Sequence, residues 1–246
     1  MPTTVEAILF DVNGTLRVRE AHEPTQRAAF ARLRELIGRD DIDWDELTRR
    51  HKSYGDWAQE NLIQLSEAEI WSRRILPEYP RERIEPVAAE LTLAWSERKG
   101  RTVPSPGADI MLAELRNRGY RLGVISNTMS TLDIPRSIES FGWQEYFDVV
   151  ILSSDLKVRK PSPEPFCEAA RRMNLTPDRC AYLGNRISKD IVGCKQADFA
   201  LGLIIEPPSG PRIDEQNQIA APDIVIRNLS ELLDIFPVTD NQRELK

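Results

Sequence analysis

The sequence predicts an α/β fold, a doubly wound and mostly parallel sheet that is interrupted by an inserted all-helical domain. Short apolar runs recur along the chain, helical patterns separate the later runs, and a long segment after the first run carries only helical patterns. Runs that are apolar throughout are typical of strands buried on both faces of a parallel sheet. Their alternation with helices favours the doubly wound arrangement.

Six segments carry the strand pattern: 5–12, 121–127, 147–153, 180–185, 199–205 and 223–228. A helix is predicted over 107–120, with Ile110, Leu112 and Leu115 on or near its apolar stripe. The apolar spacing within 162–175 predicts a second helix between later strands.

Residues 20–100 contain amphipathic helical patterns and no convincing strand. We expect one hinge of this insertion near Leu16 to Glu20 and the other in the proline-rich stretch 102–109. The discontinuous core is then expected over residues 1–18 and 104–237, and the helical domain over 19–103. A polar tail is expected over 238–246. The stretch 206–222 is expected to be a surface loop.

Composition excludes several functional classes. The formal net charge of -6 argues against a general nucleic-acid binder, which favours a basic face. No apolar stretch approaches the roughly 18 residues of a membrane span, and the N-terminus lacks the pattern of a secretory signal. The 3 cysteines form no CxxC pair. We therefore expect a cytoplasmic protein without membrane partners, while no pattern in the sequence indicates an oligomeric state.

Polar side chains follow several of the predicted strands. In an open parallel sheet, ligands bind outside the carboxyl ends of the strands. A glycine permits close backbone approach, and a neighbouring threonine offers a hydroxyl group to a phosphate. Each residue alone has a structural explanation as a turn, a helix cap or a surface charge. Together they predict one crevice, formed by Asp11, Asn13, Gly14, Thr15, Ser126, Asn127, Lys160, Asn185 and Asp190.

Four motifs in this order resemble those of the haloacid dehalogenase superfamily of hydrolases. FDVNGTL (10–16) is similar to its first motif, VISN (124–127) to its second, KPSPEPF (160–166) to its third and YLGNRISKDIVGC (182–194) to its fourth. The helical insertion stands where the phosphatase-like branch has a cap, between the first two motifs. The resemblance implies a Rossmann-like core and a small phosphorylated metabolite as substrate.

The resemblance also implies a role for each site residue. Asp11 is the expected nucleophile, which becomes an aspartyl phosphate. Ser126 and Lys160 are expected to act on the phosphoryl group, with Gly14, Thr15 and Asn127 completing the phosphate site. Mg²⁺ is the expected cofactor, because hard oxygen ligands suit it. Its expected ligands are Asp11, the backbone carbonyl of Asn13, Asn185 and Asp190.

Two asparagines depart from the family pattern. Phosphatases of this family usually carry an acid at the place of Asn13, which protonates the leaving oxygen, and another at the place of Asn185. An amide transfers no proton at neutral pH, so turnover of ordinary esters should fall by about 10²–10⁴-fold. Without the charge of an acid at 185, metal affinity should fall too. An acidic leaving group would suit such a site.

Three functions stay open on this sequence. The first is a hydrolase of phosphorylated metabolites with altered or reduced activity, and the second is a non-catalytic relative that binds a phosphorylated ligand or a protein partner. The third is a dehalogenase-like hydrolase, whose leaving group needs no proton. Around the site, we expect Arg17, Arg19 and His22 to border the pocket. The tryptophans of the insertion, Trp57, Trp71 and Trp95, are expected to serve packing.

Overall fold

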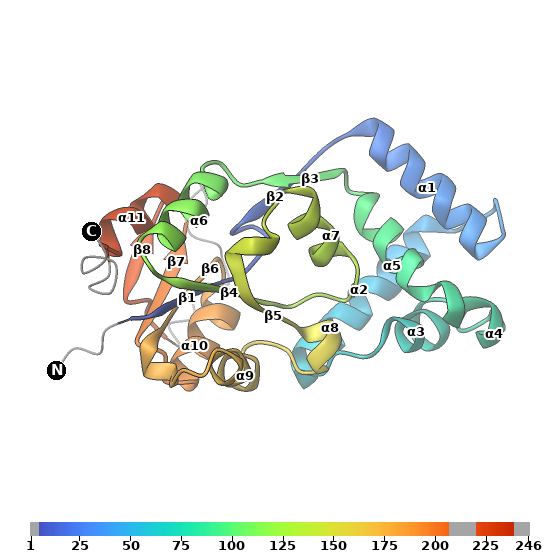
Figure 1. Ribbon diagram of the computed structural model, residues 1–246. Coiled ribbons are helices and arrows are strands. Elements are labelled where there is room, and N and C mark those ends of the chain that lie inside the picture. Colours follow the sequence, from blue (N-terminus) through green and yellow to red (C-terminus); the bar gives the residue numbers. More distant parts are fainter. Residues whose placement is uncertain (1–4, 207–219, 239–246) are drawn as a thin grey trace.

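A parallel sheet of 6 strands forms the core of the computed structural model (Figure 1). The structure describes residues 5–206 and 220–238. In spatial order the strands are β5 (Phe147–Leu152), β4 (Arg121–Ser126), β1 (Ala7–Phe10), β6 (Cys180–Gly184), β7 (Leu201–Ile205) and β8 (Ile224–Ile226). Every neighbouring pair is parallel. Each segment with the strand pattern contains one of these strands, and the predicted fold is confirmed.

Helices cover both faces of this sheet, which makes it doubly wound. In β1, Ile8 and Phe10 face one apolar core, whereas Ala7 and Leu9 face the other. Figure 1 shows α6 and α11 on one side of the sheet and α9 and α10 on the other. The helices of this region are α6 (Ala108–Asn117), α7 (Asp133–Ser140), α8 (Ser153–Leu156), α9 (Glu164–Arg172), α10 (Val192–Gln196) and α11 (Leu232–Ile235).

Strand order reverses at β1. The chain places β4 and β5 on one side of β1, and β6, β7 and β8 on the other. Such a switch point leaves a crevice at the carboxyl ends of the strands. Since β1 ends at Phe10, Asp11 lies at the mouth of that crevice.

One predicted helix face is partly wrong. In α6 the buried residues are Ala108, Met111, Leu112 and Leu115, whereas Ile110 is 73% exposed. Successive residues of a helix are rotated by about 100°, so positions 108, 111, 112 and 115 share one stripe. Ile110 lies on the opposite side.

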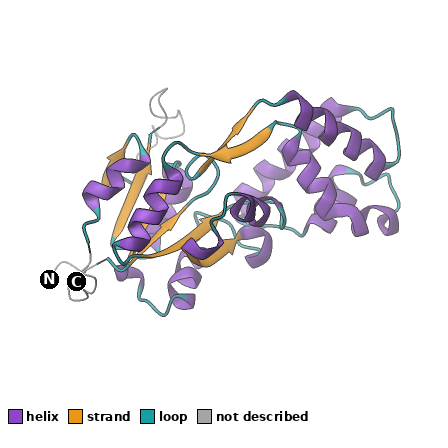
Figure 2. Cartoon of the chain, turned by 45° about the horizontal axis from the view of Figure 1, so that its top comes forward, coloured by secondary structure: helices purple, strands orange, loops and turns teal. Residues whose placement is uncertain are grey.

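The insertion is helical, as expected, and has an apolar core of its own. Its helices are α1 (Glu23–Ile37), α2 (Trp44–Asn61), α3 (Glu67–Glu69), α4 (Arg81–Ile84) and α5 (Ala88–Glu97), with a π-helical turn at Ile70–Ile75. Trp71 and Trp95 are buried in this core, and Trp57 packs against it. Figure 2 shows these helices gathered at one end of the molecule, away from the large sheet.

A short antiparallel ribbon joins the two parts of the chain. β2 (Arg17–Glu20) pairs with β3 (Arg101–Pro104), with Arg17 opposite Pro104 and Glu20 opposite Arg101. Neither strand belongs to the six segments that carry the strand pattern, so the ribbon is not predicted by the sequence. Each strand has only 4 residues and no apolar run, so its sequence gives no periodic signal. The predicted boundaries of the helical domain fall within this ribbon and stay a prediction.

Parts of two other expectations lie outside the described residues. These are the surface loop over 206–222, of which 207–219 are not described, and the polar tail over 238–246, of which only Val238 is described. Within the described ranges, none of the helices combines the length and the apolar character needed to cross a membrane.

Candidate active site

Four side chains from distant parts of the chain meet beyond the end of β1. The Lys160 ammonium group lies 2.9 Å from Asp11 Oδ1 and 2.6 Å from Asp190 Oδ1. The Ser126 hydroxyl donates to Asp11 Oδ1 at 3.1 Å. Asp11 follows β1, Ser126 ends β4, and Asp190 lies in the π-helical turn Ile187–Ile191 after β6. The structure thus brings together four of the residues that the motifs predicted.

This cluster holds one cation between two carboxylates. Lys160 is only 2% exposed, and both acids are buried. Burial favours the neutral amine, but the charges of Asp11 and Asp190 outweigh it and raise the pKa of Lys160. Burial also raises the pKa of Asp11, although the Lys160 charge opposes that shift. Lys160 therefore stays charged and offsets negative charge at the floor of the crevice.

Asp190 anchors Lys160. Its Oδ2 accepts hydrogen bonds from the backbone N–H groups of Asn185 and Arg186, at 3.0 and 2.9 Å. Its Oδ1 accepts from Lys160 and from the Tyr182 hydroxyl group, the latter at 3.2 Å. A Cβ atom at Gly184 would lie 2.3 Å from Asp190 Cγ, so this approach requires glycine. Both carboxylate oxygens are thus committed to the protein.

Tyr182 and Asn127 position the lysine. Lys160 Nζ donates to the Tyr182 hydroxyl at 2.6 Å. The amide of Asn127 accepts from the Lys160 backbone N–H at 2.9 Å and donates to its carbonyl at 3.0 Å. Tyr182 carries no functional signal in the sequence, because a tyrosine inside a buried apolar strand is typical of the core. Asn127 is expected from the motifs to bind phosphate, whereas in the structure its amide also holds the Lys160 loop.

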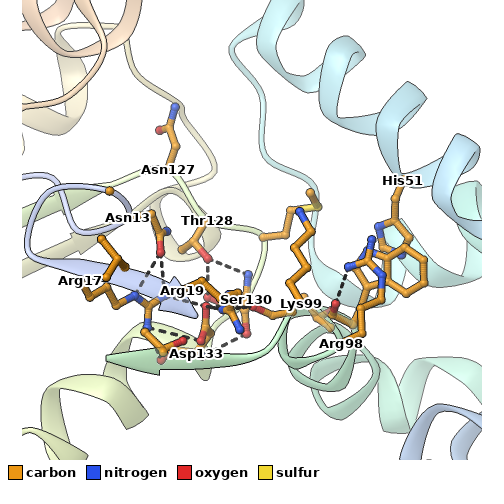
Figure 3. A pocket seen from close by; sticks show the side chains of 17 residues that line it. Asn13, Arg17, Arg19, His51, Arg98, Lys99, Asn127, Thr128, Ser130 and Asp133 are labelled. Carbon is orange, nitrogen blue, oxygen red and sulfur yellow. Dashed lines mark hydrogen bonds and ion pairs between the residues drawn. The ribbon is translucent and has the colours of Figure 1, made fainter. Parts of the chain in front are cut away.

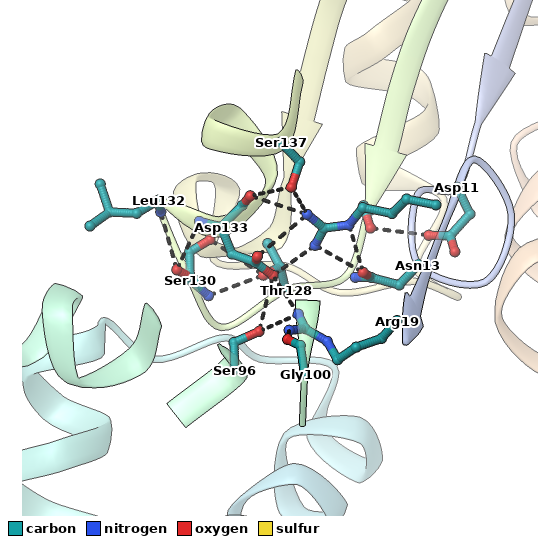
Figure 4. Close-up of polar contacts among 12 residues, drawn as sticks. Asp11, Asn13, Arg19, Ser96, Gly100, Thr128, Ser130, Leu132, Asp133 and Ser137 are labelled. Atoms are coloured by element: carbon teal, nitrogen blue, oxygen red, sulfur yellow. Dashed lines mark hydrogen bonds and ion pairs between the residues drawn. The ribbon is translucent and has the colours of Figure 1, made fainter. Parts of the chain in front are cut away.

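Asn13 is held by a buried arginine. Arg17 Nε and Nη2 donate to Asn13 Oδ1 at 3.0 and 2.9 Å (Figure 4). The same guanidinium group forms a 2.7 Å ion pair with Asp133 and a hydrogen bond with Ser137. The oxygen of the Asn13 amide therefore faces two donors. Asp133 was missed because an acid in the first turn of a helix usually has a capping role.

The residues expected to hold Mg²⁺ do not present a matching set of donors. Asn185 Nδ2 donates to the Asn13 carbonyl oxygen at 3.0 Å, and neither of these two expected ligands brings a negative charge. Asp190 is fully engaged, which leaves Asp11 as the available carboxylate. The described part of the chain contains no group of three or more His, Cys, Asp or Glu residues that could hold a metal ion. This donor set offers Mg²⁺ one available carboxylate and two uncharged oxygens, so it matches the ion weakly, and we assign no chemical step to the metal.

Gly14 and Thr15 shape the loop after β1. Gly14 has a φ of 82°, a left-handed conformation that favours glycine, and its N–H donates to the Arg17 carbonyl at 2.8 Å. The Thr15 hydroxyl is buried and has no hydrogen-bond partner within the described ranges. Gly14 lines the cavity described next, whereas Thr15 does not.

A cavity of about 500 Å³ lies between this loop and the insertion (Figure 3). Asn13, Gly14 and Asn127 line it on the core side. Arg17 and Arg19 line it as expected, whereas His22 does not: its Nδ1 instead accepts from the Thr25 N–H at the start of α1. Further lining residues come from the insertion, the ribbon and the loop after β4: Val18, His51, Thr92, Trp95, Ser96, Arg98, Lys99, Thr102, Thr128, Met129, Ser130 and Asp133.

Comparison with known proteins gives concordant matches. A family model described as haloacid dehalogenase-like hydrolase matches residues 5–198. The glyceraldehyde 3-phosphate phosphatase of Methanopyrus kandleri is 28% identical over 236 residues, which cover 94% of this chain and 97% of that protein.

Two solved structures share the fold. The 2-haloacid dehalogenase of Pseudomonas syringae has a TM-score of 0.69 at 22% identity and covers 94% of this chain and 98% of its own. CbbY of Rhodobacter sphaeroides, solved in complex with phosphate, has a TM-score of 0.61 at 24% identity and covers 93% of this chain and 96% of its own.

Proposed function

This chain belongs to the haloacid dehalogenase-like hydrolase family, and we propose that it hydrolyses small phosphorylated metabolites through an aspartyl-phosphate intermediate on Asp11. One observation carries the proposal. Asp11 Oδ1 is held by Lys160 and Ser126, whereas no donor among the described residues holds Oδ2. The carboxylate is thus oriented by one oxygen, and the other can act as a nucleophile.

The reaction has two steps. Asp11 Oδ2 attacks phosphorus, the bond from phosphorus to the leaving oxygen breaks, and that oxygen departs with the electron pair. Water then attacks the phosphorus of the aspartyl phosphate, which releases inorganic phosphate and restores the Asp11 carboxylate. The Lys160 ammonium group lowers the cost of bringing an anionic phosphoryl group to an anionic carboxylate.

Asn13 limits the range of leaving groups. An amide supplies no proton, and here its oxygen is bound by Arg17. Hydrolysis of alkyl esters is therefore expected to be slower by about 10²–10⁴-fold than with a free acid at this place. Acyl phosphates escape this loss, because their leaving group departs as a stable carboxylate.

The test compares two phosphorylated compounds. Phosphate release from acetyl phosphate should exceed that from glycerol 3-phosphate by about 10² or more, since only the ester needs general-acid help. Mass spectrometry of the quenched reaction should find a phosphorylated Asp11, and the Asp11→Asn variant should lack both adduct and turnover. No adduct and no phosphate release from a broad panel of phosphometabolites would refute the proposal.

A second candidate is a non-catalytic protein that binds a phosphorylated ligand. It is favoured by the presence of two uncharged asparagines at the site, where Asn185 Nδ2 donates to the Asn13 backbone carbonyl. Ligand binding without turnover, unchanged in Asp11→Asn, would select this candidate. The third candidate is a dehalogenase-like activity, and release of halide from 2-haloacids is the assay for it.

A further inference from the structure

We propose that Arg19, Arg98 and Lys99 form a subsite for a second anionic group of the substrate, a carboxylate or a second phosphate. This inference rests on the proposed function, because it names the class of phosphorylated metabolite that the cavity accepts. Figure 3 shows Asn13 and Asn127 on one side of the cavity, Arg98 and His51 on the other, and the Lys99 side chain between them. A ligand that reaches from the Asp11 loop into the cavity meets these cations.

The cavity wall carries an excess of positive charge. Its charged residues are four cations, with Arg17 in addition to the subsite residues, and one carboxylate, Asp133. Asp133 is engaged at 2.7 Å by Arg17 and lies 3.7 Å from Arg19. Among the residues that the structure describes, neither Arg98 nor Lys99 has an acidic partner.

Arg98 is fixed in place without being neutralised. Its guanidinium carbon lies 3.4 Å from the centroid of the Trp95 ring, and its Nη1 donates to the Trp95 carbonyl at 2.6 Å. Trp95 is itself stacked on His51, with 4.1 Å between ring centroids. Arg98 therefore presents a pre-oriented positive charge, which saves the conformational entropy of ordering it upon binding.

The cations repel one another when the cavity holds no anion. Burial and the charge of Arg19 lower the pKa of Arg98 to about 10. Burial, Arg98 and Arg19 lower the pKa of Lys99. An anion among these groups would reverse both effects, because it favours the charged forms. Unpaired lysines are common on protein surfaces, but these cations share one concave wall with the loop after Asp11.

The experiment uses substrates that differ by one anionic group. Calorimetric titration of the Asp11→Asn variant measures binding in the absence of turnover. 3-Phosphoglycerate is compared with glycerol 3-phosphate for a carboxylate, and fructose 1,6-bisphosphate with fructose 6-phosphate for a phosphate. We expect the compound with the second anion to bind about tenfold or more tightly in at least one pair, the gain expected of a charge-assisted hydrogen bond.

Two further variants assign this preference to the subsite. Added to Asp11→Asn, Lys99→Gln should remove most of the preference and leave the affinity for the monoanionic member of the pair unchanged within about twofold. Lys52→Gln is the matched control, because Lys52 lies outside this cavity on α2 and should leave the preference intact.

The outcomes separate this inference from the proposed function. Equal binding within both pairs, or a preference that survives Lys99→Gln, would overturn the subsite. If the native protein releases phosphate but shows no preference, only the subsite fails. If it shows a preference that depends on Lys99 but releases no phosphate from any compound, the subsite stands and the hydrolase proposal fails.

Discussion

Arg17 should control the protonation state of an acid placed at position 13. Its guanidinium group donates twice to Asn13 Oδ1, so a carboxylate at this place would form an ion pair with the buried Arg17 and remain ionised at neutral pH. In Asn13→Asp we therefore expect glycerol 3-phosphate turnover to rise by less than about tenfold at neutral pH, well below the 10²–10⁴ that a free acid supplies.

Phosphate release across a pH series checks this prediction. The carboxyl group of Asn13→Asp should help only where it becomes protonated, so any gain should grow as the pH falls. The Asn13→Ala variant controls for the loss of the Arg17 contact. A hundredfold gain at neutral pH would show that Arg17 does not hold the new carboxylate.

Because Asn185 carries no charge, we expect turnover by this chain to be independent of Mg²⁺. The Asn185 amide brings no negative charge, and Asp190 is bound by Lys160 and by backbone N–H groups, so Asp11 is the carboxylate of the described site that stays available to a metal ion. We expect EDTA to change native turnover by less than about twofold, whereas Asn185→Asp adds a carboxylate beside Asp11 and should create a Mg²⁺-dependent fraction of activity. Turnover of native protein that is lost in EDTA and restored by Mg²⁺ would contradict this prediction.

The residues that meet beyond β1 could be predicted individually, because strand ends and motifs mark their places in the sequence. Asp11, Ser126, Lys160 and Asp190 each stand at a fixed place in a recognisable motif. The partners of these residues could not be predicted in this way. Asp133 meets Arg17 across 116 positions of the chain, a pairing that no local pattern specifies.

The ribbon of β2 and β3 is the element that connects the site to the insertion. Three of the four residues of β2, Arg17, Val18 and Arg19, line the cavity. Arg17 is bound by Asn13 and Asp133 of the core, whereas Arg19 donates to Ser96 and to the Gly100 carbonyl at the end of the insertion. A strand of 4 residues thus contacts both parts of the chain.

Gly100 fixes the entry into this ribbon. It has a φ of 115°, and a Cβ atom there would lie 1.9 Å from the Glu20 carbonyl oxygen. Gly100→Ala should therefore lower the free energy of unfolding by about 1–3 kcal/mol, through backbone strain and displacement of β2. Because β2 carries Arg19, ligand affinity should fall as well. Urea unfolding and calorimetric titration measure the two effects.

Gly55 provides the matched control in α2. A Cβ atom at this position meets nothing within 4 Å, and the residue lies inside a helix of 18 residues. Gly55→Ala should raise the free energy of unfolding by about 0.5–1 kcal/mol, since alanine has the higher helix propensity. If Gly100→Ala were as well tolerated as Gly55→Ala, the close contact between the ribbon and Gly100 would be wrong.

For the molecule as a whole, the sequence predicts the architecture better than the contacts between its parts. Buried strands and helical patterns are periodic, so the doubly wound core and the helical insertion could be predicted before the structure was known. How the insertion sits against the core depends on single long-range contacts, such as the 2.7 Å hydrogen bond from Thr131 to Glu67 and the bridge between Ile63 and Val158. Neither pair carries a local signal.

These contacts connect the two parts, so protonation of a residue in the insertion should change the free energy of unfolding of the whole chain. His51 is buried between Trp71 and Trp95, and its ring nitrogens have no hydrogen-bond partner among the described residues. Burial, Arg98 and Lys99 lower the pKa of His51 from 6.5 to about 3. Below pH 6.5 the unfolded chain therefore takes up a proton that the folded chain excludes, and stability is lost as the pH falls toward 3.

Replacing His51 should remove this pH dependence. At about pH 5 the expected contribution is about 2 kcal/mol, so His51→Phe should unfold with a free energy that changes by about 2 kcal/mol less between pH 7 and pH 5 than that of the native chain. His22→Asn, which removes the other histidine and keeps a helix-capping side chain, is the control.

Urea unfolding is followed by tryptophan fluorescence and by far-ultraviolet circular dichroism. Coincident transitions that shift together in His51→Phe support a single cooperative unit, whereas two separate transitions, the first of them in the tryptophan signal and in part of the circular dichroism signal, would show that the insertion unfolds by itself.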